Sequence, residues 1–263
     1  MRRRFRRIGT GAATATFVAS AFLLIPAAPA HAVEICDRYA TVSVSDRAYV
    51  AQNNIWGAST AQCIDVEGTS FTVTRAEHNN STSGSPAAYP SFFRGCHWGN
   101  CTNGDNLPVP VHSMPSVTSD FSVTTAGGAW NAAYDLWYSS QRTEGADASY
   151  EAELMIWLDS QGVQPGGSMI ASNVPIAGAT WNVWYAPWDW NYIAYVRTSP
   201  THAVNDLDLR AFTQDAMSRG YIQPSWYLLA VEAGFELWQG GTGSTVNGFS
   251  VNVGSSDGNR RQR

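Results

Sequence analysis

The sequence predicts an all-β protein, a β-sandwich with one added helix. Apolar and polar residues alternate in twos along most of the chain, and this period places successive side chains on opposite faces of a strand. The alternating segments are rich in Val, Thr, Tyr and Trp, and clusters of Gly, Pro, Asn or Ser separate many of them. One segment has helical spacing instead. Together these observations are typical of a sandwich of short strands.

The strand pattern recurs along the chain. Each segment carries apolar residues at every second position, so that one face can be buried while the other meets solvent. Clear examples, in chain order, are residues 40–56, 69–78, 115–125, 132–139, 150–158, 181–187 and 190–198. Residues 234–241, GFELWQGG, form a further strand end that closes in a Gly-Gly turn.

Residues 205–220, NDLDLRAFTQDAMSRG, depart from the strand pattern. Their apolar side chains recur at helical spacing, at Leu209, Phe212, Ala216 and Met217. Asn205 and Asp206 are the candidate N-caps, and Gly220 is a C-terminal stop signal. We expect one helix here, packed on the outside of a sheet.

The beginning of the chain has the composition of a secretory signal peptide. Residues 1–7, MRRRFRR, are strongly basic, and an apolar segment follows at 15–25. The small residues Ala30-His31-Ala32 then predict cleavage after Ala32, and hence a secreted, extracellular protein. Arg2-Arg3-Arg4-Phe5 also fits a twin-arginine signal loosely, so the sequence leaves the export route open.

About 230 residues remain after that cleavage, enough for a sizeable core in one all-β domain. We expect a leader at 1–32, one domain at 33–254 and a polar, flexible tail at 255–263. No other apolar run approaches the roughly 20 residues that a membrane-spanning helix requires. We therefore expect no membrane association.

The expected mature chain is acidic. Loss of the leader removes five of the 16 basic residues and none of the 21 acidic ones, which leaves a formal charge of −10, and the chain contains no lysine. Such a surface repels phosphate backbones, and the only basic cluster after the leader is Arg260-Arg261-Gln262-Arg263. We expect a monomer with no nucleic-acid partner and no cofactor.

The four cysteines all follow the leader, and an exported protein meets an oxidising environment in which disulfides form. Three pairings are possible, and the one with the shortest loops joins Cys36 to Cys63 and Cys96 to Cys101. A metal site at Cys96, His97 and Cys101 is the alternative, but it needs reduced thiols and a fourth ligand that we do not find. We expect disulfides and no metal.

Acidic and aromatic side chains share one face of the strand YEAELMIWL. The two faces carry Glu151, Glu153, Met155 and Trp157 on one side and Tyr150, Ala152, Leu154, Ile156 and Leu158 on the other. The second set is an apolar core face. The first set suits a sugar-binding surface, because a sugar ring stacks on an indole while carboxylates meet its hydroxyls. A solvated outer face is the alternative, but an exposed sheet face usually carries polar side chains rather than Met and Trp.

Two further strands repeat this combination. In AGFELWQGG, Glu236 and Trp238 share a face, and in YDLWY, Asp135 and Trp137 share a face. Three strands therefore direct carboxylates towards what can be one groove.

Facing carboxylates are the usual apparatus of a glycosidase, in which one protonates the leaving oxygen and the other attacks the anomeric carbon or activates water. Apolar neighbours and the negative charge of Glu153 are expected to raise the pKa of Glu236, so that Glu236 stays protonated near neutrality. A third acid nearby would be protonated or hydrogen-bonded, a role that suits Asp135. We interpret Glu151 and Glu232 as surface charges.

Longer motifs resemble one enzyme family. YEAELMIWL, followed about eighty residues later by GFELWQGG, resembles glycoside hydrolase family 12, the secreted endo-β-1,4-glucanases. NNIWGAS at 53–59 and YDLWY at 134–138 are similar to further segments of that family, and PSFFRGCHWGNC with the four cysteines resembles its bacterial branch. The resemblance covers essentially the whole chain after the leader. It implies a β-jelly roll of two antiparallel sheets with a concave substrate groove, and one helix on the convex side.

The resemblance also implies a retaining double displacement on a β-1,4-glucan. Glu153 resembles the nucleophile and Glu236 the acid/base, while Asp135 resembles the acid that hydrogen-bonds the nucleophile. Retaining carboxyl pairs stand roughly 5 to 5.5 Å apart, and inverting pairs about 6.5 to 9.5 Å apart.

We expect six substrate-binding residues: Asn54, Trp56, Met155, Trp157, His97 and Trp98. The first two match the NNxWG segment of the family, whose indole stacks on a sugar in the non-leaving half of the groove. Met155 and Trp157 share a face with the nucleophile. His97 and Trp98 lie in the short disulfide loop. A structural role is the alternative for the histidine. The rings of WNVWYAPWDWNY stay unassigned individually, and some belong to the core.

Two other functions fit parts of the pattern. A carbohydrate-binding sandwich would also expose indoles but needs no facing acids, and a separation of more than about 10 Å between Glu153 and Glu236 would favour it. A related jelly-roll xylanase is the second alternative, and the contexts ELMIW and GFELW argue against it. The sequence leaves open the preferred glucan among cellulose, mixed-linkage glucan and xyloglucan.

Overall fold

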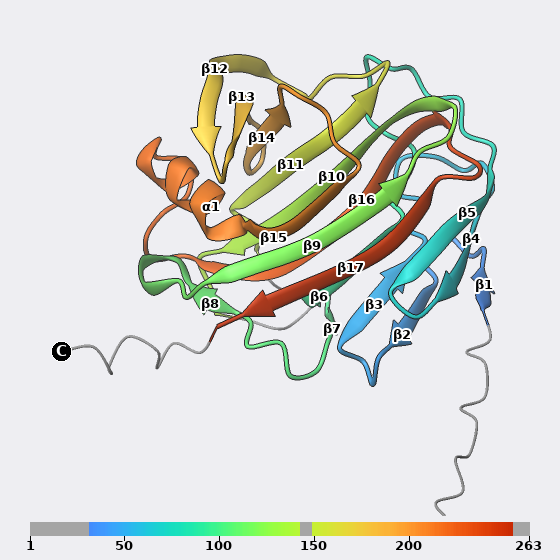
Figure 1. Ribbon diagram of the computed structural model, residues 1–263, viewed down its shortest axis with the longest axis horizontal. Coiled ribbons are helices and arrows are strands. Elements are labelled where there is room, and N and C mark those ends of the chain that lie inside the picture. Colours follow the sequence, from blue (N-terminus) through green and yellow to red (C-terminus); the bar gives the residue numbers. More distant parts are fainter. Residues whose placement is uncertain (1–31, 143–148, 255–263) are drawn as a thin grey trace, which may run out of the picture. The chain divides into compact units, whose positions relative to one another are not determined.

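The computed structural model describes residues 32–142 and 149–254, which form two packed β-sheets, as the alternating sequence predicts. The smaller sheet has six strands and the larger one eleven. Figure 1 shows the sheets as two layers, with the helix α1 at one end of the larger sheet. Most of the expected leader and the whole expected tail lie outside the described residues.

The strand order combines segments from distant parts of the chain. The smaller sheet contains β1 (Val33–Ile35), β4 (Gln62–Glu67), β5 (Ser70–Ala76), β17 (Thr245–Val253), β9 (Val117–Thr124) and β15 (Ala203–Asp208). The larger sheet contains β12 (Ser168–Ile176), β13 (Ala179–Pro187), β14 (Asn191–Arg197), β11 (Ala152–Gln161), β10 (Gly128–Ser139), β16 (Tyr227–Gly240), β6 (Ser91–His97), β3 (Tyr49–Gln52) and β2 (Thr41–Val44). Beside this path, β7 (Asn100–Cys101) pairs with β6, and β8 (Val109–Pro110) pairs with β16. A 3-10 turn spans Val111–Ser113.

Antiparallel pairing dominates both sheets, as expected of a jelly roll. The exception among the described strands is the parallel pair formed by β11 and β14. A long connection joins these two strands through the β12–β13 hairpin, so the chain can return in the same direction.

Aromatic side chains from facing strands fill the space between the sheets. Tyr134 on β10 meets Phe121 on β9 edge to face, with ring centroids 5.2 Å apart. Phe249 on β17 stacks on Phe92 of β6 at 6.4 Å. All four rings are buried, and burial of one such side chain stabilises the fold by about 2–3 kcal/mol. The period of two produces this layer, because it directs the apolar residues of each strand inward.

A second apolar cluster covers part of the other face of the larger sheet. It contains Met155 and Trp157 on β11 and Trp238 on β16, packed with residues of β10, β13 and β14. The first seven residues of β11 are all buried, so this strand is covered on both faces. The cluster therefore supports the face on which the sequence predicts the carboxylates.

The helix α1 (Leu209–Ser218) lies within the predicted helical segment and begins four residues after its predicted start. Asn205 and Asp206 are not its N-caps, because they belong to β15, and the helix begins after Asp208, whose side chain makes no capping hydrogen bond. Gly220 has a φ of 84° just beyond the helix end, so the predicted stop is confirmed.

One apolar face of α1 joins the core. Phe212 lies edge to face with Trp181 of β13 at 4.9 Å and with Tyr195 of β14 at 5.2 Å. The helix thus covers the core-side face of these two strands. Within the described ranges, no helix combines the length and the apolar character needed to cross a lipid bilayer.

Both predicted disulfides are present. Cys36 is joined to Cys63 and Cys96 to Cys101, each with a Cα–Cα distance of 4.1 Å. The sulfur atoms of Cys96 and Cys101 are bonded to each other, so they are not the thiolate ligands that a metal site at His97 would need.

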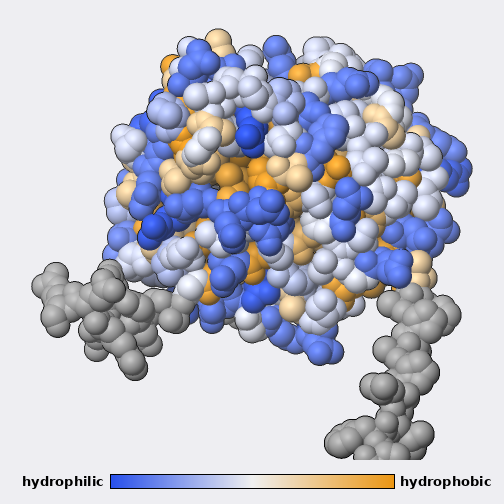
Figure 2. All heavy atoms as spheres, viewed as in Figure 1, coloured by the Kyte–Doolittle hydropathy of each residue, from blue (hydrophilic) through white to orange (hydrophobic). Residues whose placement is uncertain are grey.

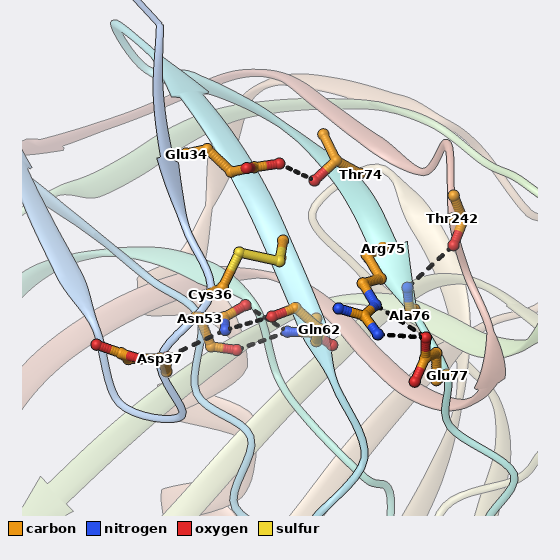
Figure 3. The surroundings of a disulfide bond; sticks show 11 residues. Glu34, Cys36, Asp37, Asn53, Gln62, Thr74, Arg75, Ala76, Glu77 and Thr242 are labelled. Atoms are coloured by element: carbon orange, nitrogen blue, oxygen red, sulfur yellow. Dashed lines mark hydrogen bonds and ion pairs between the residues drawn. A yellow bond between two sulfur atoms is a disulfide. The ribbon is translucent and has the colours of Figure 1, made fainter.

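The first disulfide lies beside a buried polar pair. Figure 3 shows Asn53 and Gln62 next to Cys36, joined by hydrogen bonds. The Nδ2 atom of Asn53 also donates to the carbonyl of Gln62 at 3.0 Å. Together these bonds tie the segment after β3 to β4 and hence link the two sheets.

The surface seen in Figure 2 is largely hydrophilic, with hydrophobic residues gathered in small areas between polar ones. The exposed large apolar side chains among the described residues are Val33, Tyr39, Trp56, Trp98, Met169, Ile170 and Trp188. Two of these indoles, Trp56 and Trp98, are predicted to bind substrate.

Candidate active site

Four carboxylates gather on one face of three adjacent strands, β11, β10 and β16, which Figure 1 shows side by side. Asp135 at the middle strand is directly opposite Met155 on one side and Glu232 on the other. Glu153 is opposite Trp137, and Glu236 is opposite Asn131. Residues directly opposed in a sheet project from the same face. The predicted convergence of acids from three strands is therefore present, and it includes one acid that was not expected.

Glu153 is almost enclosed, with 9% of its surface exposed. The Nε1 atom of Trp190 donates a hydrogen bond of 2.7 Å to its Oε2 atom. Burial, and next the charge of Glu236, raises the pKa of Glu153 to about 8, while the bond from Trp190 opposes this rise. Since the effect of a charge falls off with distance, the two glutamates belong to one site.

Glu236 is held from two sides by Asn131. The Nδ2 atom of Asn131 donates to the Oε2 atom of Glu236, and its Oδ1 atom accepts the backbone N–H of Glu236 at 3.1 Å. Burial raises the pKa of Glu236 to about 7, and the bond from Asn131 opposes this rise. The side chain of Glu236 is half-buried. The predicted effect of burial on the pKa of Glu236 is confirmed, whereas the charge interaction between the two glutamates appears in the pKa of Glu153.

Asp135 is 5% exposed and lies between the strands that carry the two glutamates. Burial, and next the charge of Glu153, raises the pKa of Asp135 well above its usual value, which favours the protonated form. Its Oδ1 atom is buried without a hydrogen-bond partner among the described residues. The coupling between Asp135 and Glu153 is therefore electrostatic here, rather than the expected hydrogen bond.

Two tyrosines lie among these acids. The charges of Asp135, Glu153 and Glu236 all raise the pKa values of the hydroxyls of Tyr89 and Tyr192, after burial as the largest cause. The hydroxyl of Tyr89 donates to the carbonyl of Ala133 at 3.0 Å, which fixes this ring against β10. Both tyrosines stay neutral and can donate or accept hydrogen bonds beside the carboxylates.

The comparisons with known proteins agree with this geometry. Residues 47–254 match the family described as glycosyl hydrolase family 12. The chain belongs to this family. In family 12, it is 53% identical to the solved structure of endoglucanase Cel12A from Rhodothermus marinus, with a TM-score of 0.81 over 84% of this chain and 99% of that one.

Curated relatives extend the comparison within family 12. Endoglucanase S from Pectobacterium parmentieri is 30% identical, over 78% of this chain and 81% of the relative. A xyloglucan-specific endo-β-1,4-glucanase A from Emericella nidulans is 29% identical, over 84% and 91%. The chain is thus a family 12 glycoside hydrolase that acts on β-glucans.

Of the six predicted substrate-binding residues, two present open indoles. Trp56 is 44% exposed and Trp98 is 54% exposed. The guanidinium of Arg38 donates to the backbone carbonyls of residues 55, 56 and 58 and so holds the segment that carries Trp56. Asn54 has a φ of 40°, and its carbonyl accepts the N–H of Tyr89 at 2.9 Å.

Met155 and Trp157 lie deeper than predicted. Each is 1% exposed, and the Nε1 atom of Trp157 donates to the sulfur of Met155 at 3.4 Å. Neither side chain offers an open surface to a sugar, because the second apolar cluster covers both. Met155 and Trp157 therefore pack in this cluster beside the carboxylates and do not offer the substrate contact that was predicted.

The disulfide loop contributes one exposed and one largely buried ring. Trp98 stacks on Tyr150 at 4.5 Å, and its backbone N–H donates to the hydroxyl of Tyr150 at 3.0 Å. The side chain of His97 is 13% exposed, and its Nδ1 atom contacts Glu232. Glu232 is fully buried, so its interpretation as a surface charge is wrong.

Sequence reasoning missed Asn131, Trp190, Tyr89 and Glu232. The signal for Asn131 was available, because it lies three residues before YDLWY and four before Asp135, which places it on the face of Asp135. Trp190 was one of several indoles in a segment left unassigned. Tyr89 precedes β6, and only the pairing of distant strands brings it to the site.

Two pockets in the described part of the protein lie away from the carboxylates. One of about 550 Å³ is at the turn between β12 and β13, and it contains none of the four carboxylates. The chemistry of the carboxylates, and not this pocket, therefore identifies the site.

Proposed function

We propose that this family 12 enzyme is a secreted, retaining endo-β-1,4-glucanase, with Glu153 as nucleophile and Glu236 as acid/base. One observation carries the proposal: a buried glutamate on β11 and a half-buried glutamate on β16 are electrostatically coupled, and each accepts a hydrogen bond from its own donor. A binding module would have no need of two desolvated acids whose pKa values are raised towards neutrality.

The first step transfers the sugar to the protein. The carboxylate of Glu153 attacks the anomeric carbon, the bond from that carbon to the glycosidic oxygen breaks, and Glu236 gives its proton to the departing oxygen. With pKa values of about 8 and 7, the two carboxyls together hold a proton at neutral pH. The Trp190 donor favours the charged form of Glu153, and a glycosidic oxygen, as an acceptor, favours the protonated form of Glu236.

The second step returns the site to its starting state. Glu236, now a carboxylate, takes a proton from a water molecule whose oxygen attacks the anomeric carbon and displaces Glu153. Esterification of Glu153 has removed its negative charge, so the pKa of Glu236 falls, and Glu236 becomes a base of suitable strength. Two displacements at one carbon give overall retention.

Asp135 is a positioning residue in this scheme. As a neutral acid beside Glu153, it can donate a hydrogen bond to the nucleophile once the side chains adjust around the substrate. The exposed indoles of Trp56 and Trp98 supply stacking surfaces for glucose units.

Glucan preference has two candidates. The 53% identical relative is called an endoglucanase, which favours cellulose and mixed-linkage glucan. The relative from Emericella nidulans is called xyloglucan-specific, so xyloglucan is the second candidate. Initial rates on these three polymers distinguish the candidates directly.

The proposal includes the processing expected from the sequence. Residues 1–32 are proposed as a leader, 33–254 as the catalytic domain and 255–263 as a tail. We also propose that the mature protein is a monomer.

The decisive experiment measures reducing-sugar release from carboxymethyl cellulose and mixed-linkage β-glucan by the parent, Glu153→Ala and Glu236→Ala. We expect activity in the parent and a loss of at least about 10³-fold in both variants. Glu151→Ala is the matched control, since this partly exposed glutamate lies on the same segment. Proton NMR of the first products should show the β-anomer. An inactive parent that binds the polymers would overturn the proposal, and an initial α-anomer would overturn retention.

A further inference from the structure

Glu232 is a buried acid that the proposed mechanism does not use. It is 0% exposed, although it lies on the same strand and face as Glu236. Its Oε2 atom accepts hydrogen bonds from Gln52 at 2.8 Å and from Ser91 at 3.4 Å. Its Oε1 atom contacts the Nδ1 atom of His97. Burial of a carboxylate destabilises the fold unless its charge is balanced. The contact with His97 can offset this desolvation cost.

His97 lies against Glu232 and among three aromatic rings. Its ring lies 4.3 Å from Trp98, 5.5 Å from Phe93 and 6.5 Å from Trp137, measured between ring centroids. The side chain of His97 is 13% exposed, and shielding from water strengthens the attraction between opposite charges. The disulfide next to His97 closes the loop and holds the ring over Glu232.

The pair lies directly beside the reacting groups. Glu232 is opposite Asp135 in the sheet, and its charge acts on Asp135, Glu153, Tyr89 and Tyr150. These side chains face it from β10, from β11 and from the segments that precede β6 and β11, while Glu236 lies on its own strand. Among the described residues, His97 is the only basic side chain that contacts any of the four carboxylates.

We propose that His97 and Glu232 form a charge-balancing pair that controls the ionisation of Glu153 and Asp135. This inference rests on the proposed function and goes beyond it, since neither residue touches the substrate bond. With His97 charged, the pair is close to neutral, and Glu153 can ionise beside it. Without His97, the negative charge of Glu232 acts on Glu153 uncompensated. Both are positioning residues that act through Glu153 and Asp135.

The proposal predicts opposite effects from two substitutions of similar size. His97→Gln should move the midpoint of the acid limb of the kcat/KM profile to higher pH by about one unit, because it leaves the charge of Glu232 unbalanced. Glu232→Gln should move this midpoint to lower pH by about one unit, because it leaves the charge of His97 unbalanced. The double variant should return to within a few tenths of a unit of the parent. Ser91→Ala removes one hydrogen bond to Glu232 but no charge, and it should leave the midpoint in place.

A purely structural role would not produce opposite signs. Shifts in the same direction for the two single variants, or no shift in variants whose circular dichroism is native, would overturn the proposal. The double variant tests coupling, since independent structural damage would add rather than cancel.

A second measurement does not depend on activity. The chain has eight glutamates, so Cδ-labelled protein should give a resolvable ¹³C titration in which Glu153→Gln identifies the signal of Glu153. This signal should move in the same opposite directions in His97→Gln and Glu232→Gln. If the parent shows no glucanase activity but the titrations shift as expected, the proposed function fails and the pair stands. If the parent is an active glucanase but the titration of Glu153 is the same in both variants, the proposed function stands and the charge-balancing pair fails.

Histidine NMR of the unmodified protein covers the case in which a variant does not fold. In the active enzyme both ring nitrogens of His97 should carry a proton, and a His97 ring with one unprotonated nitrogen would overturn the proposal.

Discussion

The proton balance of the site depends on single hydrogen-bond donors. Burial disfavours the charged form of each glutamate, and one donor on each opposes this effect: Trp190 on Glu153 and Asn131 on Glu236. A site with desolvation alone would keep both acids protonated, and the nucleophile would then be inert. The donors therefore control how much carboxylate is present.

Trp190→Phe keeps an aromatic ring but removes the hydrogen bond to Glu153. Since this bond lowers the pKa of Glu153, its loss should move the acid limb of the kcat/KM profile to higher pH. At pH 5.5 we expect a loss of about 10- to 100-fold, which corresponds to a hydrogen bond to a charged group. Trp188→Phe changes a neighbouring ring that does not contact Glu153, and it should not shift the limb. Equal shifts in both variants would contradict this role.

Glu153→Gln should stabilise the fold at alkaline pH. The pKa of Glu153 is raised from its usual value to about 8, so its stabilising contribution is fully present below its unfolded pKa and is lost as pH rises through about 8. The glutamine side chain of the variant does not ionise, so the variant does not lose this stability as pH rises. Urea unfolding should show the variant more stable than the parent by about 2–4 kcal/mol at pH 8.5, with little difference at pH 4. A difference independent of pH would exclude ionisation as its cause.

Among the elements, β10 organises the site. It lies between β11 and β16 and carries Asn131, Asp135 and Trp137 on the face of the carboxylates, while Tyr134 and Leu136 enter the core. Its pairing with β11 shifts register between residues 132 and 133, and its pairing with β16 shifts between 129 and 130 and between 137 and 138. Such irregularities bend a strand and redirect its side chains.

Gly234, the glycine of GFELW, allows close approach between β16 and the segment before β6. A Cβ atom at this position would lie 2.1 Å from the carbonyl oxygen of Pro90, so the strands would have to separate. Gly234→Ala should therefore displace Tyr89, reduce kcat by at least about 10-fold and destabilise the fold by about 2–4 kcal/mol. Gly127→Ala is the matched control, because a Cβ there meets nothing within 4 Å. Native activity and stability in Gly234→Ala would contradict this account.

At the scale of the whole molecule, residues 33–254 contain every strand that the structure describes. The first strand begins at Val33, and the last one ends at Val253. A chain trimmed to residues 33–254 should therefore have the same melting temperature, to within about 2 °C, and the same kcat/KM as the chain that retains 255–263. Calorimetry and the glucan assay test this. A large loss of stability would show that the tail belongs to the folded domain.

Much of the fold could be predicted from the chain alone. The two-residue period predicted the sandwich, because burial of one strand face depends on local alternation. The helix was predicted in the right segment, but its start was predicted too early. Asn205 and Asp206 lie at a register shift within β15, and the residues on either side of them pair with β9. Both disulfides followed from the spacing and the expected compartment of the four cysteines.

The sequence by itself determined the fold class, the acid-and-indole faces and, through its motifs, the family with its glutamates. Only the tertiary structure decided which side chains are enclosed and what touches them. It buried Met155, Trp157 and Glu232, and it placed Trp190 on Glu153. The physical reason is that alternation specifies the face on which a side chain lies, whereas its partners depend on the register of strands that are distant along the chain.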